Sequence, residues 1–323
     1  MTMHANLLQP IEATGGSRRW DLLAIGDPVA DIVVSVAEPP PLGTKVLGRL
    51  MGVLSGGTTA NVACACARLG KRAALLGRVG DDAHGPMLRA SLVQFEVGTE
   101  QLVTIEHAAS ASVIAMIAPS GERAIVYMPM QPPPAAVPPE TWAAARIVYT
   151  MPYDLERFVH LADAAHEAGT LVAIDLEPAV APDRTAMLER IRRADVVFFN
   201  EAGFRAGTGE APCRAELSRL IEAGPRVIVV TLGAAGAMAA SRTDFAMQEA
   251  FPGRVIDTTG AGDTFNAAFL VALLDGAPLP RALRFACAAA SCTVAALGAR
   301  AGLPSRQVVE ALLSASPPMT TGK

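Results

Sequence analysis

The sequence is poor in aromatic and in charged residues. Aromatic side chains make up 5% of its 323 residues and charged side chains 18%, against a hydrophobic fraction of 51%. This balance excludes a disordered or highly solvated chain and predicts a globular protein with a buried core. The formal net charge of -4 comes without any run of Lys or Arg. The sequence therefore predicts no nucleic-acid partner.

Long apolar stretches are also missing. Runs such as residues 267–274 stop well short of the roughly 20 residues that a helix needs to cross a bilayer. We therefore expect no membrane-spanning helix and no membrane partner. Residues 1–19 lack the apolar stretch of a secretion signal, which predicts a loose N-terminal tail and a cytoplasmic protein. Residues 317–323 are expected to form a C-terminal tail.

Cysteine is scarce and shows no pairing pattern. The five cysteines, at positions 64, 66, 213, 287 and 292, contain no Cys-x-x-Cys spacing. An odd number without such pairs favours buried reduced thiols over disulfides or zinc ligands. The five histidines are scattered along the chain, so no metal cluster is predicted.

Strand-like and helix-like segments alternate along the chain, which is typical of an α/β fold with a central, mainly parallel sheet flanked by helices. We expect one such domain over residues 20–316. An apparent hairpin at residues 113–127, with turn-favouring residues in its middle, interrupts the alternation of strand-like and helix-like segments. Together with a Pro-rich break at residues 131–139, it predicts a small β-strand lid contributed by about residues 32–53 and 103–130.

The run from Asp257 to Asp263 passes from a Gly-rich turn into an apolar helical segment, which is typical of a helix N-terminus. Glycines permit the tight turn, and the free N–H groups of the first helical turn then point outward with the positive end of the helix dipole. Donors at Gly260, Ala261 and Gly262 would stabilise a phosphoryl group during transfer. Asp263 would accept the proton of the attacking hydroxyl. We expect the helix dipole to hold this carboxylate ionised, which makes it a weak base.

A second glycine pair, Gly56-Gly57, precedes another helical segment at residues 58–69, with Asn61 at its opening. Either motif alone is weak, because an isolated Gly-x-Gly-Asp usually marks only a loop and a helix start. Together, and in this order, the two motifs resemble the signatures of the ribokinase-like (PfkB) carbohydrate kinase family. The resemblance covers roughly residues 20–304. It implies a ribokinase-like fold and ATP-dependent phosphorylation of a small polyol.

The family pattern implies roles for the residues around the acceptor. Asp31 would grip the acceptor hydroxyls, and Gly56, Gly57 and Asn61 would form the second wall of that pocket, whereas Asp27 matches less well. A carboxylate and an amide suit a polyol, because they accept and donate hydrogen bonds to adjacent hydroxyls. The expected acceptor is a sugar or a sugar acid.

The resemblance also implies a nucleotide site. The loop at Thr231, Gly233 and Gly236 would lie beside the phosphates and ribose of ATP. Cys287 would pack against the adenine, at a position where many relatives have Asn. The backbone carbonyls of Asp257 and Thr259 would hold a monovalent cation such as K⁺.

Magnesium handling departs from the family pattern. Asn200 and Glu201 would order Mg²⁺ through water, but the family commonly has Asn-x-x-Glu, and Gly203 stands at the final position here. The outer shell of the metal is therefore incomplete. Mg²⁺ needs few protein ligands, because ATP itself brings oxygens to it.

Other acceptors would use the same phosphate chemistry. A nucleoside kinase would need an aromatic platform for the base, and the predicted lid has few aromatics. A sugar-phosphate kinase would need cations near the pocket, for which Lys45, Arg49 and Arg123 are candidates. A sensor that binds sugar or nucleotide without catalysis is a third alternative, and the retained Asp263 argues against it.

Two other classes of nucleotide-binding protein are excluded. Neither a Gly-x-Gly-x-x-Gly after the first strand nor a Walker-type Gly-x4-Gly-Lys-[Ser/Thr] occurs, which argues against an oxidoreductase and a P-loop site. A strand-built lid is marginal alone and can pair between subunits, so a homodimer is expected.

Overall fold

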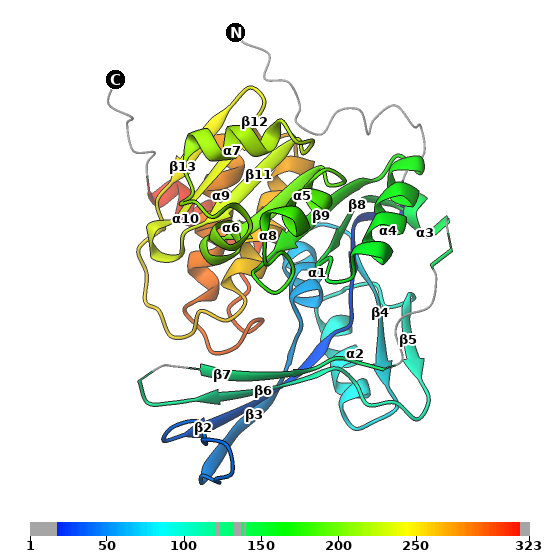
Figure 1. Ribbon diagram of the computed structural model, residues 1–323, viewed down its shortest axis with the longest axis vertical. Helices are drawn as coiled ribbons and strands as arrows, with labels where there is room; N and C mark the ends of the chain where they lie inside the picture. Colours follow the sequence, from blue (N-terminus) through cyan, green and yellow to red (C-terminus); the bar gives the residue numbers. More distant parts are fainter. Residues whose placement is uncertain (1–17, 121–122, 132–136, 139, 317–323) are drawn as a thin grey trace.

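The computed structural model describes residues 18–120, 123–131, 137–138 and 140–316 (Figure 1). Most of the two expected tails, and part of the Pro-rich segment at residues 131–139, lie outside the described residues. No described helix is long and apolar enough to span a bilayer.

A large, mainly parallel sheet forms the centre of the protein. Within the described chain its nine strands follow the order β13-β12-β11-β10-β9-β8-β1-β4-β5. The pairs from β11 to β5 are parallel, whereas β12 and β13 add an antiparallel edge. Strands of such a sheet are covered on both faces and are therefore continuously apolar. The strands are β1 (Trp20–Ile25), β4 (Ala73–Gly80), β5 (Leu102–Ile105), β8 (Ala145–Thr150), β9 (Leu171–Leu176), β10 (Val196–Asn200), β11 (Val227–Thr231), β12 (Ala237–Ser241) and β13 (Phe245–Gln248).

Helices cover both faces of this sheet and bury a separate apolar cluster on each (Figure 1). One face carries α1 (Thr58–Arg68), α2 (His84–Gln94), α8 (Ala261–Leu274), α9 (Leu279–Thr293) and α10 (Arg306–Ala315). The other face carries α3 (Glu140–Ala143), α4 (Leu155–Glu167), α5 (Arg184–Ile191), α6 (Glu201–Thr208) and α7 (Arg214–Ile221). The predicted α/β architecture is confirmed.

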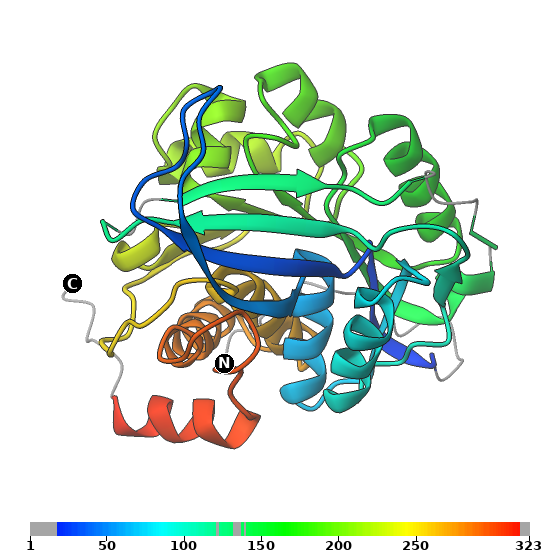
Figure 2. The same ribbon diagram turned by 90° about the horizontal axis from the view of Figure 1, so that it is seen from below.

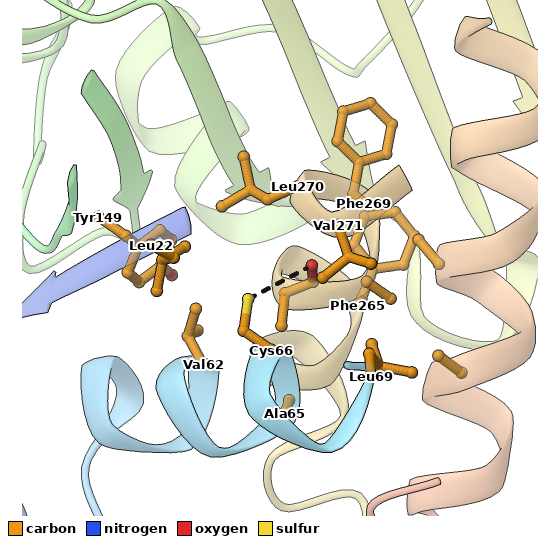
Figure 3. Close-up of a cluster of buried hydrophobic side chains, with 14 of the residues drawn as sticks. Leu22, Val62, Ala65, Cys66, Leu69, Tyr149, Phe265, Phe269, Leu270 and Val271 are labelled. Atoms are coloured by element: carbon orange, nitrogen blue, oxygen red, sulfur yellow. Dashed lines mark hydrogen bonds between the residues drawn. The ribbon is translucent and has the colours of Figure 1, made fainter. Parts of the chain in front are cut away.

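Helices α1 and α8 pack against each other, although they are far apart in the sequence (Figure 3). The thiol of Cys66 lies 3.8 Å from the carbonyl oxygen of Ala267. Apolar side chains of both helices, including Val62, Leu69 and Phe269, fill the space around this contact. This packing brings the starts of the two helices together, and both glycine motifs stand at those starts.

A second, four-stranded sheet forms the lid, in the order β3-β2-β6-β7. Its strands are β2 (Val29–Val36), β3 (Gly48–Gly56), β6 (Ser112–Ile117) and β7 (Arg123–Met128). Because β2 continues the chain directly from β1, the lid lies at the carboxyl ends of the parallel strands (Figures 1 and 2). The predicted β6–β7 hairpin is confirmed by its antiparallel register.

One expected boundary was wrong. The lid was expected to include residues 103–105, but β5 pairs with β4 and extends the large sheet instead. Helix α9 ends at Thr293, and turns follow it as far as residue 302. These turns approach the start of α8, so they matter for the site.

Candidate active site

The start of α8 forms a turn that only glycine fits well. Gly260 has a left-handed backbone conformation with φ of +75°, and a Cβ added there would lie 2.7 Å from Cα of Ala299. This contact packs the turn against residues 294–302, the segment that follows α9. In the first turn of α8, the N–H of Ala261 donates to the carbonyl of Thr258 at 3.2 Å and that of Thr264 to the carbonyl of Gly260 at 2.9 Å. The other N–H groups of this turn are the ones that a helix N-terminus offers to an anion. Asp263 stands in the same turn with a half-buried side chain.

Asn61 joins the two glycine motifs into one site. Its Nδ2 donates a hydrogen bond of 2.7 Å to Oδ2 of Asp263, across 202 residues of sequence. The side chain of Asn61 is 5% exposed, so its position is fixed by packing in α1. The amide therefore holds one oxygen of the Asp263 carboxylate in place.

Asp31 lies in lid strand β2, not at the solvated end of β1. It stands in the middle of its strand, opposite Leu54 on β3 and Val113 on β6. A Cβ added to Gly56 would lie 2.0 Å from Oδ2 of Asp31. The glycine therefore makes room for the carboxylate, and the two residues lie against each other as the predicted acceptor wall requires.

Burial changes the proton affinity of both carboxylates. It raises the pKa of Asp263 to about 6, and the Asn61 hydrogen bond and the charge of Arg300 lower it less than burial raises it. Burial also raises the pKa of Asp31 to about 6, against the lowering effect of Arg300. The expectation that the helix dipole keeps Asp263 a weak base was wrong, because partial burial outweighs the dipole. A carboxylate with a pKa nearer to neutral is a better general base.

A third carboxylate lies behind Asp263. Asp175, at the end of β9, accepts hydrogen bonds of 2.9 Å from Asn266 Nδ2 and 3.3 Å from the hydroxyl of Tyr149. Burial, followed by the charges of Asp263 and Glu177, raises its pKa to about 7. Because Asn266 stands one turn after Asp263 in α8, this network anchors the helix start to the sheet.

The loop after β11 is a tight turn that depends on two glycines. Gly233 and Gly236 have positive φ angles of +57° and +99°. A Cβ at Gly236 would lie 2.0 Å from the carbonyl oxygen of Gln248. The N–H of Leu232 donates to the carbonyl of Gly236 at 2.8 Å and closes the loop. Thr231 ends β11 at the same edge of the sheet as Asp175. In open α/β sheets, ligands bind at this edge.

Comparison with known proteins identifies the family. The family model described as pfkB family carbohydrate kinase matches residues 21–306. The chain belongs to the pfkB family. It is an ATP-dependent carbohydrate kinase of ribokinase-like fold, as the two motifs predicted.

Several relatives are ribokinases. The chain is 32% identical over 302 residues to a ribokinase of Bacillus subtilis, covering 91% of this chain and 99% of that one. A solved structure of Arabidopsis thaliana ribokinase complexed with ribose and ATP matches with a TM-score of 0.83 and 28% identity, over 92% of this chain and 99% of that one. A nucleoside kinase of Methanothermobacter thermautotrophicus is 29% identical over 289 residues, covering 88% of this chain and 92% of that one.

The side chains of Asn200 and Glu201 are engaged within their own helix, α6. Asn200 caps α6, because its Oδ1 accepts a hydrogen bond of 2.7 Å from the N–H of Gly203. Glu201 forms an ion pair of 2.9 Å with Arg205 on the exposed side of the same helix. A Cβ at Gly203 would lie 2.2 Å from the carbonyl oxygen of Leu176, so the usual Glu has no space here. Among the described residues, no group of three or more His, Cys, Asp and Glu could hold a metal.

Asp257 links the residues that precede α8 to the segment that follows α9. Its Oδ1 accepts hydrogen bonds from the N–H and the hydroxyl of Thr259, at 2.9 and 2.7 Å, and its Oδ2 accepts one of 2.8 Å from the N–H of Gly298. Among the causes that lower the pKa of Asp257 is the charge of Arg123 on the lid. Cys287 is buried in α9 at 5% exposure, which leaves little of its surface for adenine.

The remaining charged candidates are paired elsewhere or exposed. Asp27 forms a bidentate pair with Arg78, with Nη2 of the arginine 2.6 Å from Oδ2 and its Nε 3.2 Å from Oδ1. This pairing explains why Asp31, rather than Asp27, is available to an acceptor. Lys45 and Arg49 are exposed in and next to β3.

Sequence reasoning missed the most connected residue of the site, Arg300. Its side chain reaches Asn61 and Gly56, two of the residues predicted to bind the acceptor. Glu177, which follows β9, was also missed. Its charge raises the pKa of Asp263, and its Oε1 accepts a hydrogen bond from the hydroxyl of Tyr153.

Proposed function

We propose that this kinase transfers the γ-phosphoryl group of ATP to a hydroxyl of a small sugar, with Asp263 as the general base. The observation that carries the proposal is the 2.7 Å contact between Asn61 and Asp263. It joins the acceptor wall, formed by Asp31, Gly56, Gly57 and Asn61, to the anion site at the start of α8. Acceptor and phosphate would therefore meet at the Asp263 carboxylate.

The chemistry follows from this arrangement. Asp31 and Asn61 would position the acceptor, so that one hydroxyl lies against the free oxygen of Asp263. That oxygen takes the proton as the acceptor oxygen attacks phosphorus in line, and ADP leaves. The N–H groups of Gly260, Ala261 and Gly262 would stabilise the charge on the transferring oxygens. Thr231, Gly233 and Gly236 would hold the rest of the nucleotide, with Cys287 behind the adenine.

Ribose is the first acceptor that we propose. Relatives across several organisms are named ribokinases, and the Arabidopsis thaliana ribokinase structure holds ribose and ATP. The small pocket wall of one carboxylate and one amide suits a polyol with adjacent hydroxyls. A sugar acid is the next candidate of the same class.

A nucleoside is the second candidate acceptor. Two of the three tyrosines of the chain, Tyr127 on the lid and Tyr153 after β8, are near enough that the charge of one raises the pKa of the other. Both rings are about half exposed, at 51% and 53%. They offer the base platform that the sequence alone did not predict, and aromatic rings bind bases by stacking.

A phosphorylated sugar has weaker support. A relative in Halopiger xanaduensis is named ATP-dependent ribose-1-phosphate kinase and is 29% identical over 307 residues. Of the three cations that could bind its phosphate, Lys45 and Arg49 are exposed, and Arg123 influences Asp257 at the nucleotide side. A non-catalytic sensor is the remote alternative, and the raised pKa of Asp263 argues against it.

We propose that Mg²⁺ arrives bound to the phosphates of ATP, because residues 200–203 do not fit a direct site. When bound, the ion would neutralise phosphate charge. Activation by K⁺ at the backbone of Asp257 and Thr259 stays a prediction, which a comparison of rates in KCl and in NaCl tests. A higher rate in KCl is the expected result.

We also propose a homodimer that forms through the lid, in the cytoplasm. Lid strands β3 and β7 expose apolar side chains, among them Leu50 at 62% and Ile125 at 60%. A second copy would cover them. Sedimentation as a monomer at micromolar concentration would contradict the dimer. The cytoplasmic assignment is supported by the five free cysteines of the described chain.

An acceptor panel tests the proposed function most directly. ADP release would be measured with ribose, other sugars, sugar acids, sugar phosphates and nucleosides at equal concentration. The proposal expects the highest kcat/KM with ribose or a related sugar. A higher value with nucleosides would support the second candidate. Silence with every acceptor, while ATP still binds, would support the sensor.

A further inference from the structure

Arg300 is a buried cation that uses all three of its nitrogens on the acceptor side of the site. It stands in residues 294–302, and its residue is only 7% exposed. Its Nε donates to Oδ1 of Asn61 at 2.9 Å, its Nη1 to Oγ of Ser91 at 2.8 Å, and its Nη2 to the carbonyl of Gly56 at 2.8 Å. A buried guanidinium with three satisfied donors is held in one geometry.

The contact with Asn61 decides which way that amide points. Because Oδ1 of Asn61 accepts from Arg300, its Nδ2 must face Asp263. The flipped amide would place its oxygen against the Asp263 carboxylate and its NH₂ group against the guanidinium, so both contacts would become repulsive. Arg300 therefore removes the wrong orientation of the residue that holds the proposed base.

The same residue ties the acceptor wall to the phosphate side. Gly56 is the last residue of lid strand β3 and lies against Asp31. Its carbonyl therefore stands at the junction between the lid and α1. On the other side of Arg300, Ala299 packs against Gly260, and the N–H of Gly298 binds Asp257. The segment 298–300 thus touches both halves of the site within three consecutive residues.

We infer that Arg300 is a positioning residue that orients the Asn61 amide toward Asp263 and fixes the acceptor wall against the phosphate loop. The inference rests on the proposed function, because it concerns the residue that holds the proposed base. Arg300 itself touches neither reacting group. Its effect on turnover passes through Asn61, whereas its contact with Gly56 fixes the acceptor wall.

The positive charge of Arg300 distinguishes the positioning role from a purely structural one, because its loss should change the pH dependence of activity. The groups that influence Asp263 are the amide of Asn61 on α1, the cation of Arg300, the carboxylate of Asp31 on the lid, and the carboxylates of Asp175 in β9 and Glu177 just after it. Of the groups in this set, Arg300 carries the positive charge. It lowers the pKa of both Asp31 and Asp263. Its removal leaves carboxylates facing one another.

The first experiment compares Arg300→Met with the wild type across pH. We expect kcat to fall about tenfold or more, because the base is no longer held in line. The acidic midpoint of kcat/KM should move up by about one pH unit, since an opposing charge within reach shifts a pKa by that order. Arg300→Lys keeps the charge but cannot reach all three partners, so it should lower kcat with little change in the midpoint.

The second experiment is a double-mutant cycle with Asn61→Ala. If Arg300 acts through Asn61, the double variant should turn over within about twofold of Asn61→Ala alone, because the two losses are not additive. Arg89→Gln is the matched control. Arg89 stands near Ser91 on α2 but donates to the carbonyl of Leu102 at 2.8 Å, so its loss should leave the pH midpoint unchanged.

The outcomes separate this inference from the proposed base. A folded Arg300→Met enzyme with the wild-type midpoint, or losses that multiply in the double variant, refutes the role of Arg300. Either result leaves Asp263 as the base if Asp263→Asn is inactive. Should Arg300→Met fail to fold, a Lys variant with wild-type kcat refutes the inference alone, and a Lys variant with low kcat and an unmoved midpoint supports it.

Discussion

The acidic side of the pH profile is the most detailed consequence of the site. Burial raises the pKa values of Asp263 and Asp31 to about 6, above the usual value for an aspartate. Asp263 must be ionised to accept a proton, and Asp31 must be ionised to accept hydrogen bonds from acceptor hydroxyls. Activity should therefore fall as the pH drops through about 6, where an ordinary aspartate would stay ionised until about pH 4.

The expected drop in kcat/KM depends on how many carboxylates must be ionised for activity. At pH 5, about one unit below each pKa, roughly a tenth of each carboxylate is ionised. If both are required, kcat/KM should drop to roughly a hundredth of its plateau, with a limiting slope near two. The two groups influence each other, so the profile reports their joint titration rather than each alone. Asp31→Asn should reduce the limiting slope to one.

The assay must separate titration from unfolding. ADP can be quantified directly by chromatography between pH 4.5 and 8, without coupling enzymes that have their own pH limits. A carboxylate with a raised pKa stabilises the folded state below its unfolded pKa, and this contribution is lost as the pH rises through the folded pKa. Lowering the pH from 8 to 5 therefore removes no stability through Asp263 and Asp31. A kcat/KM that stays flat down to pH 4.5 would refute the reasoning.

Three substitutions test separate parts of the site. Gly56→Ala places a methyl group 2.0 Å from the Asp31 carboxylate, so the KM of the acceptor should rise about tenfold or more in steady-state kinetics, while that of ATP changes little. Gly203→Glu should lower stability by about 1–3 kcal/mol in a denaturant titration without tightening Mg²⁺ binding, because its Cβ meets a backbone carbonyl at 2.2 Å. Asp27→Asn breaks the pair with the buried Arg78, so the melting temperature should fall while the acceptor KM stays the same.

The alternation of apolar strands and helices predicted most of the fold, because both faces of a parallel sheet must be covered. It did not predict β5, a four-residue strand at the edge of the sheet that carries little periodic signal. It also missed α6, whose start is set by the Asn200 side chain on the N–H of Gly203. Asn200 was read as a ligand-binding residue and not as a helix cap.

The site was predictable where its residues stand in compact motifs. Asp263, Asn61 and Asp31 were named from the sequence, and in the structure Asn61 donates to Asp263 and the charge of Asp31 influences it, while their roles stay predictions. Arg300 was not, because its bond to Asn61 spans 239 residues and leaves no local pattern. The proton affinity of Asp263 was misjudged for a related reason. The helix dipole is visible in the sequence, whereas the burial that outweighs it depends on the packed lid and helices.

Replacing Asp263 by Asn tests the central claim most directly. The amide has nearly the same shape and can still accept the hydrogen bond from Asn61, so ATP and sugar binding, measured by calorimetry, should stay near the wild-type values. Thermal melting at pH 8 should show no loss of stability, because the variant removes a partly buried charge. Turnover should fall by about 10² or more, the usual contribution of a general base. Near-normal turnover in a folded variant that binds both substrates would contradict the account.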